Sequence, residues 1–134
     1  MAVKAQDLKS EQIDNVLSIV ESRLDKKTAS DAGKFVRQFY ERPSPEDVTS
    51  VLPEYLYGAA LSLYKFAATR LPGTTKLRVF TPDLEEHGWK TTHSVIEIVN
   101  DDMPFLVDSV TAALNSRGLT VHQVIHPVVY VERD

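Results

Sequence analysis

Carboxylate side chains gather at the point where an expected strand passes into an expected helix. Asp101 and Asp102 are adjacent at this turn, and Asp108 follows one helical turn later. Such carboxylates act as a catalytic acid and base only with a facing partner and raised pKa values. As helix caps they need nothing more, because Asp accepts hydrogen bonds from the unpaired N–H groups of a first turn. We therefore predict that Asp101 and Asp102 cap the helix, and we predict no catalytic residues in the chain.

The same turn could instead bind a small molecule. The first N–H groups of a helix bind carboxylates and phosphates, but the two aspartates would repel an anion that carried no positive charge. A zwitterionic amino acid could place its carboxylate at the helix N–H groups and its ammonium group at the aspartates. The plain capped helix and the amino-acid site both stay open on the residues alone. The effector-binding hypothesis comprises Asp101, Asp102, Met103, Pro104, Phe105 and Asp108.

Other residue types that could do chemistry lack the required spacing. His122 and His126 lie in a β-branched stretch, where a separation of four residues places two side chains about 13 Å apart, too far to share a metal. Ser109 lacks the G-x-S-x-G flanks of a hydrolase nucleophile. The five glycines are too scattered for a dinucleotide-binding or phosphate-binding loop. We therefore predict neither a metal site nor a cofactor site in this chain.

The composition is that of an ordinary globular protein. The 134 residues are 43% hydrophobic and 25% charged, which argues against disorder over most of the chain. A net charge of −4 argues against nucleic-acid binding, and no apolar run approaches the roughly 20 residues that span a bilayer. The absence of cysteine excludes a disulfide scaffold, and the first residues lack the apolar segment of a secretory signal. We expect a cytoplasmic protein with no nucleic-acid or membrane partner.

The periodicity of apolar residues divides the chain into two parts. Helices are predicted at residues 10–26, 31–41, from Ser44 onward, and 53–70. Strands are predicted at residues 76–81 and 92–99, separated by a loop at 82–89, and a helix follows from Leu106 to a stop at Gly118. A long strand is predicted at residues 119–131, where Pro127 marks an edge, a bulge or a break. The predicted fold class is α+β, with a helical N-terminal segment at residues 1–72 and a β-β-α-β domain at residues 73–134.

This arrangement leaves a sheet that needs further cover. A strand, helix and strand in succession pair in parallel, and the usual second helix of a ferredoxin-like sheet does not follow the last strand. We expect the cover to come from the N-terminal helices, from a second copy of the chain, or from the rest of a longer parent. Tyr57 and Tyr64 lie off the main apolar face of their helix, so they are the aromatic residues we expect at a partner surface.

The run NDDMPFLVDSVTAALNSRGLTVHQVIHPVVYVERD resembles the N-terminal region of the large bacterial NAD-dependent glutamate dehydrogenases. The preceding residues extend the resemblance to about residues 55–134. In that family a downstream catalytic domain oxidises glutamate to 2-oxoglutarate with NAD. The N-terminal region carries ACT-like domains, a class that commonly senses amino acids and mediates subunit contacts. The resemblance thus implies an ACT-like, ferredoxin-like regulatory or oligomerisation domain, catalytically inert alone, in a homo-oligomeric parent that binds NAD elsewhere.

The sequence departs from that class at one position. Ligand-binding ACT domains usually carry a glycine in the turn, in a pattern like D-x-P-G-L, and Phe105 stands at the corresponding place. A phenyl side chain there could fill the pocket or seal it. Two hypotheses follow: an effector-sensing module that binds an amino acid at residues 101–108, and a purely structural domain that assembles subunits without an effector.

Overall fold

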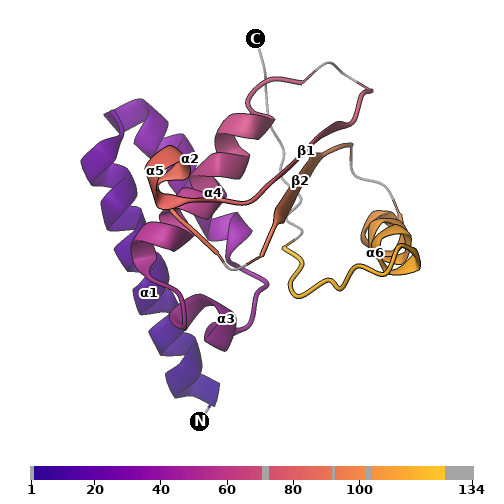
Figure 1. Ribbon diagram of the computed structural model, residues 1–134. Coiled ribbons are helices and arrows are strands. Elements are labelled where there is room, and N and C mark those ends of the chain that lie inside the picture. The colour runs from indigo at the N-terminus through magenta and orange to yellow at the C-terminus, as the bar shows by residue number, and fades with distance from the viewer. Residues whose placement is uncertain (1, 71–72, 92, 102–103, 126–134) are drawn as a thin grey trace.

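The computed structural model describes residues 2–70, 73–91, 93–101 and 104–125. Within these residues the fold is α+β, with six helices and one two-stranded antiparallel sheet (Figure 1). The elements in chain order are α1 (Ala2–Arg23), α2 (Lys26–Phe39), α3 (Pro45–Thr49), α4 (Pro53–Ala67), β1 (Lys76–Phe80), α5 (Leu84–His87), β2 (Val95–Val99) and α6 (Leu106–Ser116). The predicted fold class is confirmed at this level.

The helical half holds the hydrophobic core. Helix α1 packs against α2, α3 and α4, and α4 also contacts α2 and β2. Local signals set the helix starts: the Asp25 side chain accepts from the N–H of Thr28, and the Ser44 side chain accepts from the N–H of Asp47. Both are N-caps of the usual kind, and the predicted helix start at Ser44 is confirmed. The buried apolar side chains of this core are Val16, Val20, Ala32, Phe35, Val36, Phe39, Tyr40, Val48, Leu56, Ala60 and Leu61.

The sheet faces α4 with a polar cluster. Arg78 on β1 lies opposite Glu97 on β2, and its Nε donates to Glu97 Oε1 at 2.5 Å. Glu97 is 6% exposed, and its other carboxylate oxygen accepts from the Ser62 hydroxyl of α4 at 2.8 Å. A buried carboxylate is tolerated because these donors replace the water it loses. The inner face of the sheet is therefore attached to α4 through hydrogen bonds between this ion pair and Ser62.

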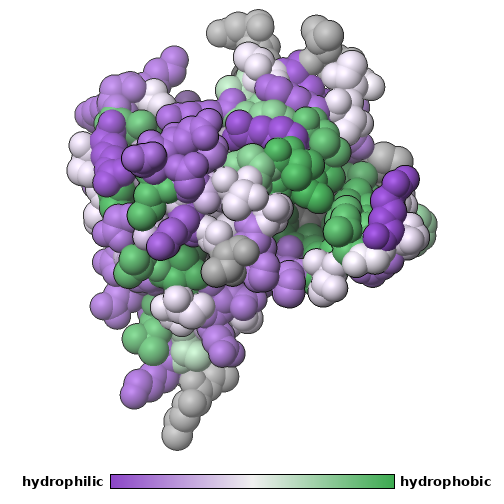
Figure 2. Space-filling model, viewed as in Figure 1, coloured by the Kyte–Doolittle hydropathy of each residue, from purple (hydrophilic) through white to green (hydrophobic). Residues whose placement is uncertain are grey.

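The outer face of the sheet is apolar and exposed. Side chains alternate between the two faces of a strand, so the pairs Leu77–Ile98 and Val79–Ile96 point away from α4. Leu77 and Val79 are 57% and 60% exposed, and Ile96 is 37% exposed. Apolar surface gathers over β1 and β2 and beside α6 (Figure 2). This outer face, defined by Leu77, Val79, Ile96 and Ile98, has the apolar character of a surface that packs against something.

The segment predicted as a loop at residues 82–89 contains helix α5. Its N-cap is Asp83, whose side chain accepts from the N–H of Glu86, and Gly88 ends it in the left-handed conformation at φ 79°. Trp89 then turns inward and is 6% exposed. Its ring covers Gly58 so closely that a Cβ on that glycine would lie 2.6 Å from the indole. Gly58 thus lets this segment pack on α4.

The chain after α6 differs from the predicted strand. Gly118 has a φ of 77°, so the predicted helix stop is confirmed. Residues 119–125 form no strand, because Ile125 packs against the helical core and the His122 ring stacks on His93 instead of joining a ladder. Pro127 and the rest of the predicted strand lie outside the described residues. The β-β-α-β order therefore has only its β-β-α part in the described chain.

Candidate functional site

The turn between β2 and α6 is organised by an arginine from the end of the helical half. Arg70 donates from Nη2 to Asp101 Oδ1 and from Nη1 to the Thr74 carbonyl, both at 2.5 Å. The Arg70 side chain is 10% exposed and that of Asp101 is 66% exposed. Asn100 donates from Nδ2 to the Asp101 carbonyl at 3.2 Å and accepts from Thr75 Oγ1 at 2.8 Å. The turn is thus fixed by contacts from before β1.

This arrangement corrects the predicted helix cap. The N-cap of α6 is Phe105, and no side-chain hydrogen bond caps the helix there. Asp101 is held by Arg70 instead, because a guanidinium within reach offers a charge-assisted bond that competes with capping. Asp102 lies outside the described residues.

Phe105 holds an unusual backbone conformation. Its φ of 62° and ψ of 14° are left-handed, and it is the one non-glycine residue with positive φ in the described part of the chain. Side chains with a Cβ adopt this region at a cost, which is why glycine is favoured there. The glycine of the D-x-P-G-L pattern therefore corresponds to a position that needs left-handed backbone. The phenyl ring is 76% exposed, so contacts within the described chain do not compensate the strain.

The other residues of the effector-binding hypothesis are only partly described. Pro104 and Asp108 are both exposed, as is Asp101, while Met103 and Asp102 lie outside the described residues. The Asp101 carboxylate that was expected to meet an ammonium group already faces Arg70. An amino acid at this turn would therefore have to share Asp101 with Arg70.

Histidines and carboxylates come together in two other places. His93 and His122 stack with ring centroids 4.0 Å apart, whereas His126 lies outside the described residues. Asp83, Glu86 and His87 place one ligand atom each within 4.8 Å of one another, close enough to hold an ion. Their local roles explain this proximity, because Asp83 caps α5 and His87 Nδ1 accepts from the N–H of Asp83.

The two tyrosines expected at a partner surface lie on α4 with part of each side chain exposed. Tyr57 and Tyr64 are half-buried against the helical core. Tyr64 meets the Phe35 ring at 5.4 Å between centroids, and Arg23 lies over the Tyr57 ring at 5.2 Å. Helix α4 contacts both α1 and α2, so more than its main apolar stripe is in contact, and the expected role of these tyrosines at a partner surface stays a prediction. Across the described helices, none combines the length and the apolar character needed to cross a bilayer.

The comparisons with known proteins point in one direction. Residues 35–134 match the family described as glutamate dehydrogenase, ACT1 domain. The chain is 45% identical over 115 residues to an NAD-specific glutamate dehydrogenase of Halomonas elongata, which covers 86% of this chain and 7% of that protein. It is 36% identical over 99 residues to the NAD-specific glutamate dehydrogenase of Pseudomonas aeruginosa, covering 74% of this chain and 6% of that protein. No solved structure matches the chain.

Proposed function

The chain belongs to the glutamate dehydrogenase ACT1 domain family, and on that premise we propose that it is the N-terminal regulatory and oligomerisation domain of an NAD-dependent glutamate dehydrogenase. The chain spans 6% to 7% of the length of the curated relatives it matches. In the proposal, the parent converts L-glutamate, NAD and water to 2-oxoglutarate, ammonium and NADH in the cytoplasm. Catalysis and NAD binding belong to the rest of the parent, and this domain is not catalytic by itself.

The observation that carries the assembly part of this proposal is the uncovered outer face of the sheet. Leu77 and Val79 on β1 expose more than half of their surface, beside Ile96 on β2. Exposure of apolar side chains to water is unfavourable. A sheet face that presents only such side chains is therefore stabilised when another surface covers it. Phe105, 76% exposed in a strained conformation, adds a further apolar contact. Strained residues persist where the surrounding contacts or a function hold them.

A second copy of the chain is the occupant we propose for this outer face. The face carries no charged residue, so two copies can meet without unpaired charges, and a two-fold contact places the same patch on both sides. A domain that assembles subunits in this way brings neighbouring regulatory turns into one particle.

Sedimentation equilibrium of the chain tests this assembly. We expect reversible self-association at about 1 mM protein, abolished by Val79→Lys because a charge in a dry apolar contact is costly. The matched control is Leu52→Lys, which places the same charge at a residue of nearly equal exposure, 57% against 60%, on the helical half. A strict monomer, or equal effects of the two substitutions, would contradict the proposal.

The regulatory part of the proposal places an amino-acid effector at Asp101, Asp102, Met103, Pro104, Phe105 and Asp108. What supports it is the turn itself: left-handed backbone at Phe105, the N-terminus of α6, and an arginine beside Asp101. Arg70 could receive the carboxylate of an amino acid while Asp108 receives its ammonium group.

Calorimetry with a panel of L-amino acids tests the effector. We expect saturable heat for one or more of them, reduced by Arg70→Gln and Asp108→Asn. Because Arg70 also fixes the turn, Asp108→Asn is the cleaner variant, and Asp47→Asn on α3 is its control. The absence of heat at about 10 mM ligand would sink the effector hypothesis and leave a purely structural assembly domain, the alternative from the sequence.

A further inference from the structure

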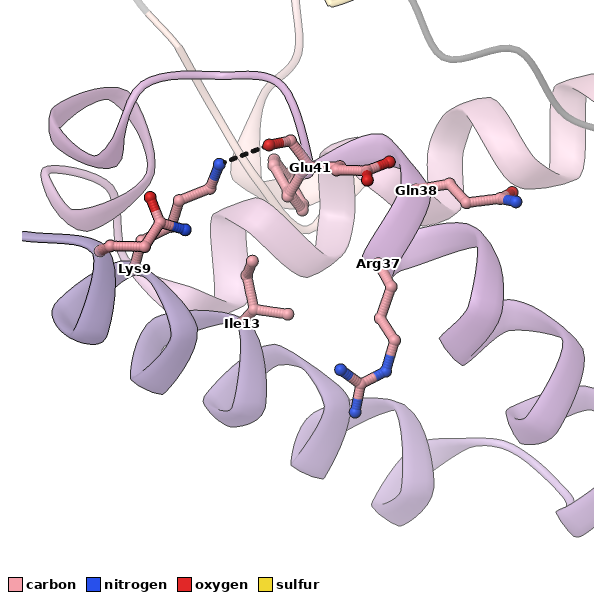
Figure 3. Close-up of a pocket in the computed structure, with 7 residues that line it drawn as sticks. Lys9, Ile13, Arg37, Gln38 and Glu41 are labelled. Carbon is pink, nitrogen blue, oxygen red and sulfur yellow. Dashed lines mark hydrogen bonds between the residues drawn. The ribbon is translucent and has the colours of Figure 1, made fainter. Parts of the chain in front are cut away.

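A cavity of about 390 Å³ opens between α1 and α2, in the helical half of the chain. Figure 3 shows Lys9 and Ile13 rising from α1 while Arg37 reaches toward α1 from α2. Its volume lies within the range of small-molecule sites in proteins. Three of its lining residues, Gln6, Lys9 and Ile13, precede the region matched by the family. None of its lining residues belongs to the β2–α6 turn or to the outer face, so the cavity is separate from both.

Lys9 is a buried cation whose charge is already compensated. It is 3% exposed, and its Nζ donates to the main-chain carbonyls of Glu41 at 2.7 Å and Pro43 at 2.6 Å. Burial lowers the pKa of Lys9, and the nearby Glu41 carboxylate opposes this lowering. The ammonium group thus fixes the chain after α2 and supplies one rigid wall of the cavity.

Arg37 supplies a charge that is not compensated. Its side chain is exposed, and no hydrogen bond or ion pair joins it to another residue in the described ranges. Glu41 lies four residues further on, yet the two salt bridges of the described chain do not include this pair. With the charges of Lys9 and Glu41 balancing each other, the cavity retains about one positive charge. The Arg37 guanidinium carries it, and guanidinium groups bind carboxylates through bidentate hydrogen bonds.

The rest of the lining is partly apolar. Ile13 lies between Lys9 and Arg37 (Figure 3), and the buried Tyr40 also lines the cavity. The Gln6 amide adds a neutral polar group that can donate or accept. An inorganic anion would leave the apolar floor uncovered, whereas a carboxylic acid with a short hydrocarbon part would cover it.

We propose that this cavity binds a small organic carboxylate, with the Arg37 guanidinium on the carboxylate and Ile13 and Tyr40 against its hydrocarbon part. Binding joins α1 to α2 at the end remote from their connecting turn. The site thus offers a second ligand-dependent control of the helical half, independent of any amino acid at the β2–α6 turn.

The test titrates the chain with butyrate and with succinate, followed by calorimetry and by amide chemical shifts. We expect saturable binding of at least one of them, with the largest shifts at residues 6–13 and 37–41. Arg37→Gln should weaken that binding at least about tenfold, since it removes a charged hydrogen-bond donor. The matched control is Lys34→Gln, which removes an exposed charge from the same helix and should change affinity by less than about twofold. Arg37 is exposed, so its substitution leaves the fold intact, which circular dichroism verifies.

Three results would overturn the proposal. The first is no saturable binding of either acid at about 20 mM. The second is equal weakening by Arg37→Gln and Lys34→Gln, which would indicate non-specific charge attraction. The third is inorganic phosphate binding at the same residues as tightly as the organic acids, which would show that the hydrocarbon part contributes nothing.

Discussion

Replacing Phe105 by glycine is expected to stabilise helix α6, contrary to the usual effect of glycine. Phe105 has a φ of 62°, where a residue with a Cβ is disfavoured by about 1–2 kcal/mol. Glycine relieves this cost but gains about 0.5–1 kcal/mol of extra freedom in the unfolded chain. The fair reference is Phe105→Ala, which loses the same phenyl ring but keeps the Cβ. We expect the glycine variant to be more stable than the alanine variant by about 1 kcal/mol.

Native-state hydrogen exchange of the α6 amides is the assay, because no residue of α6 is buried and the helix opens locally. A difference of about 1 kcal/mol corresponds to about fivefold slower exchange in Phe105→Gly than in Phe105→Ala. Ser109, exposed within α6, supplies the control pair. There the order should reverse, with Ser109→Ala about fivefold better protected than Ser109→Gly. Faster exchange in Phe105→Gly than in Phe105→Ala would refute the left-handed assignment and the strain argument built on it.

Three further predictions concern the packing that positions the turn. Gly58→Ala should destabilise the chain by about 1–3 kcal/mol in urea unfolding, because the new Cβ would lie 2.6 Å from the Trp89 indole. The control is Gly33→Ala, where the new Cβ lies 3.5 Å from its nearest atom and should stabilise the chain by about 0.5–1 kcal/mol. Similar effects of the two substitutions would contradict the packing of Trp89 on Gly58. Burial raises the pKa of Tyr40, so the stability that its neutral form contributes is full below about pH 10 and falls above it by about 1.4 kcal/mol per pH unit. Tyr40→Phe should flatten this alkaline loss, and an unchanged slope between about pH 10 and 12 would argue against the burial. Arg78→Met should lower the free energy of unfolding by about 1–3 kcal/mol, because it removes the ion-pair partner of the buried Glu97 carboxylate. Adding Glu97→Gln should recover part of that loss. Strict additivity of the two substitutions would show that the two side chains do not interact.

Local patterns in the sequence predicted most of the elements. The Ser44-Pro45 start, the strands β1 and β2 and the stop at Gly118 follow from capping chemistry and periodicity, which depend on neighbouring residues only. Helix α5 also had a local signal, since Asp83 followed by Glu86 is a capping pattern, but its four residues carry too little periodicity to predict.

The candidate site was predictable only in part, because its key contact is long-range. Arg70 and Asp101 are 31 residues apart, and no periodicity relates them. The predicted cap is wrong at Asp101 for that reason: a carboxylate next to a helix start was assigned to the helix, while the fold brings a guanidinium to it. The left-handed conformation of Phe105 was not predicted, although glycine usually stands at this place in ligand-binding ACT domains.

The central claim is that a second copy of the chain covers the outer face of the sheet, and engineered cysteines test it most directly. The chain contains no cysteine, so a single substitution reports on one position. Under mild oxidation, Val79→Cys should form a covalent dimer much faster than Leu52→Cys, although the two positions are 60% and 57% exposed. Faster coupling at Val79 is the result we predict. Equal coupling rates at the two positions, or faster coupling at Leu52, would contradict the assignment of the outer face as the contact between subunits.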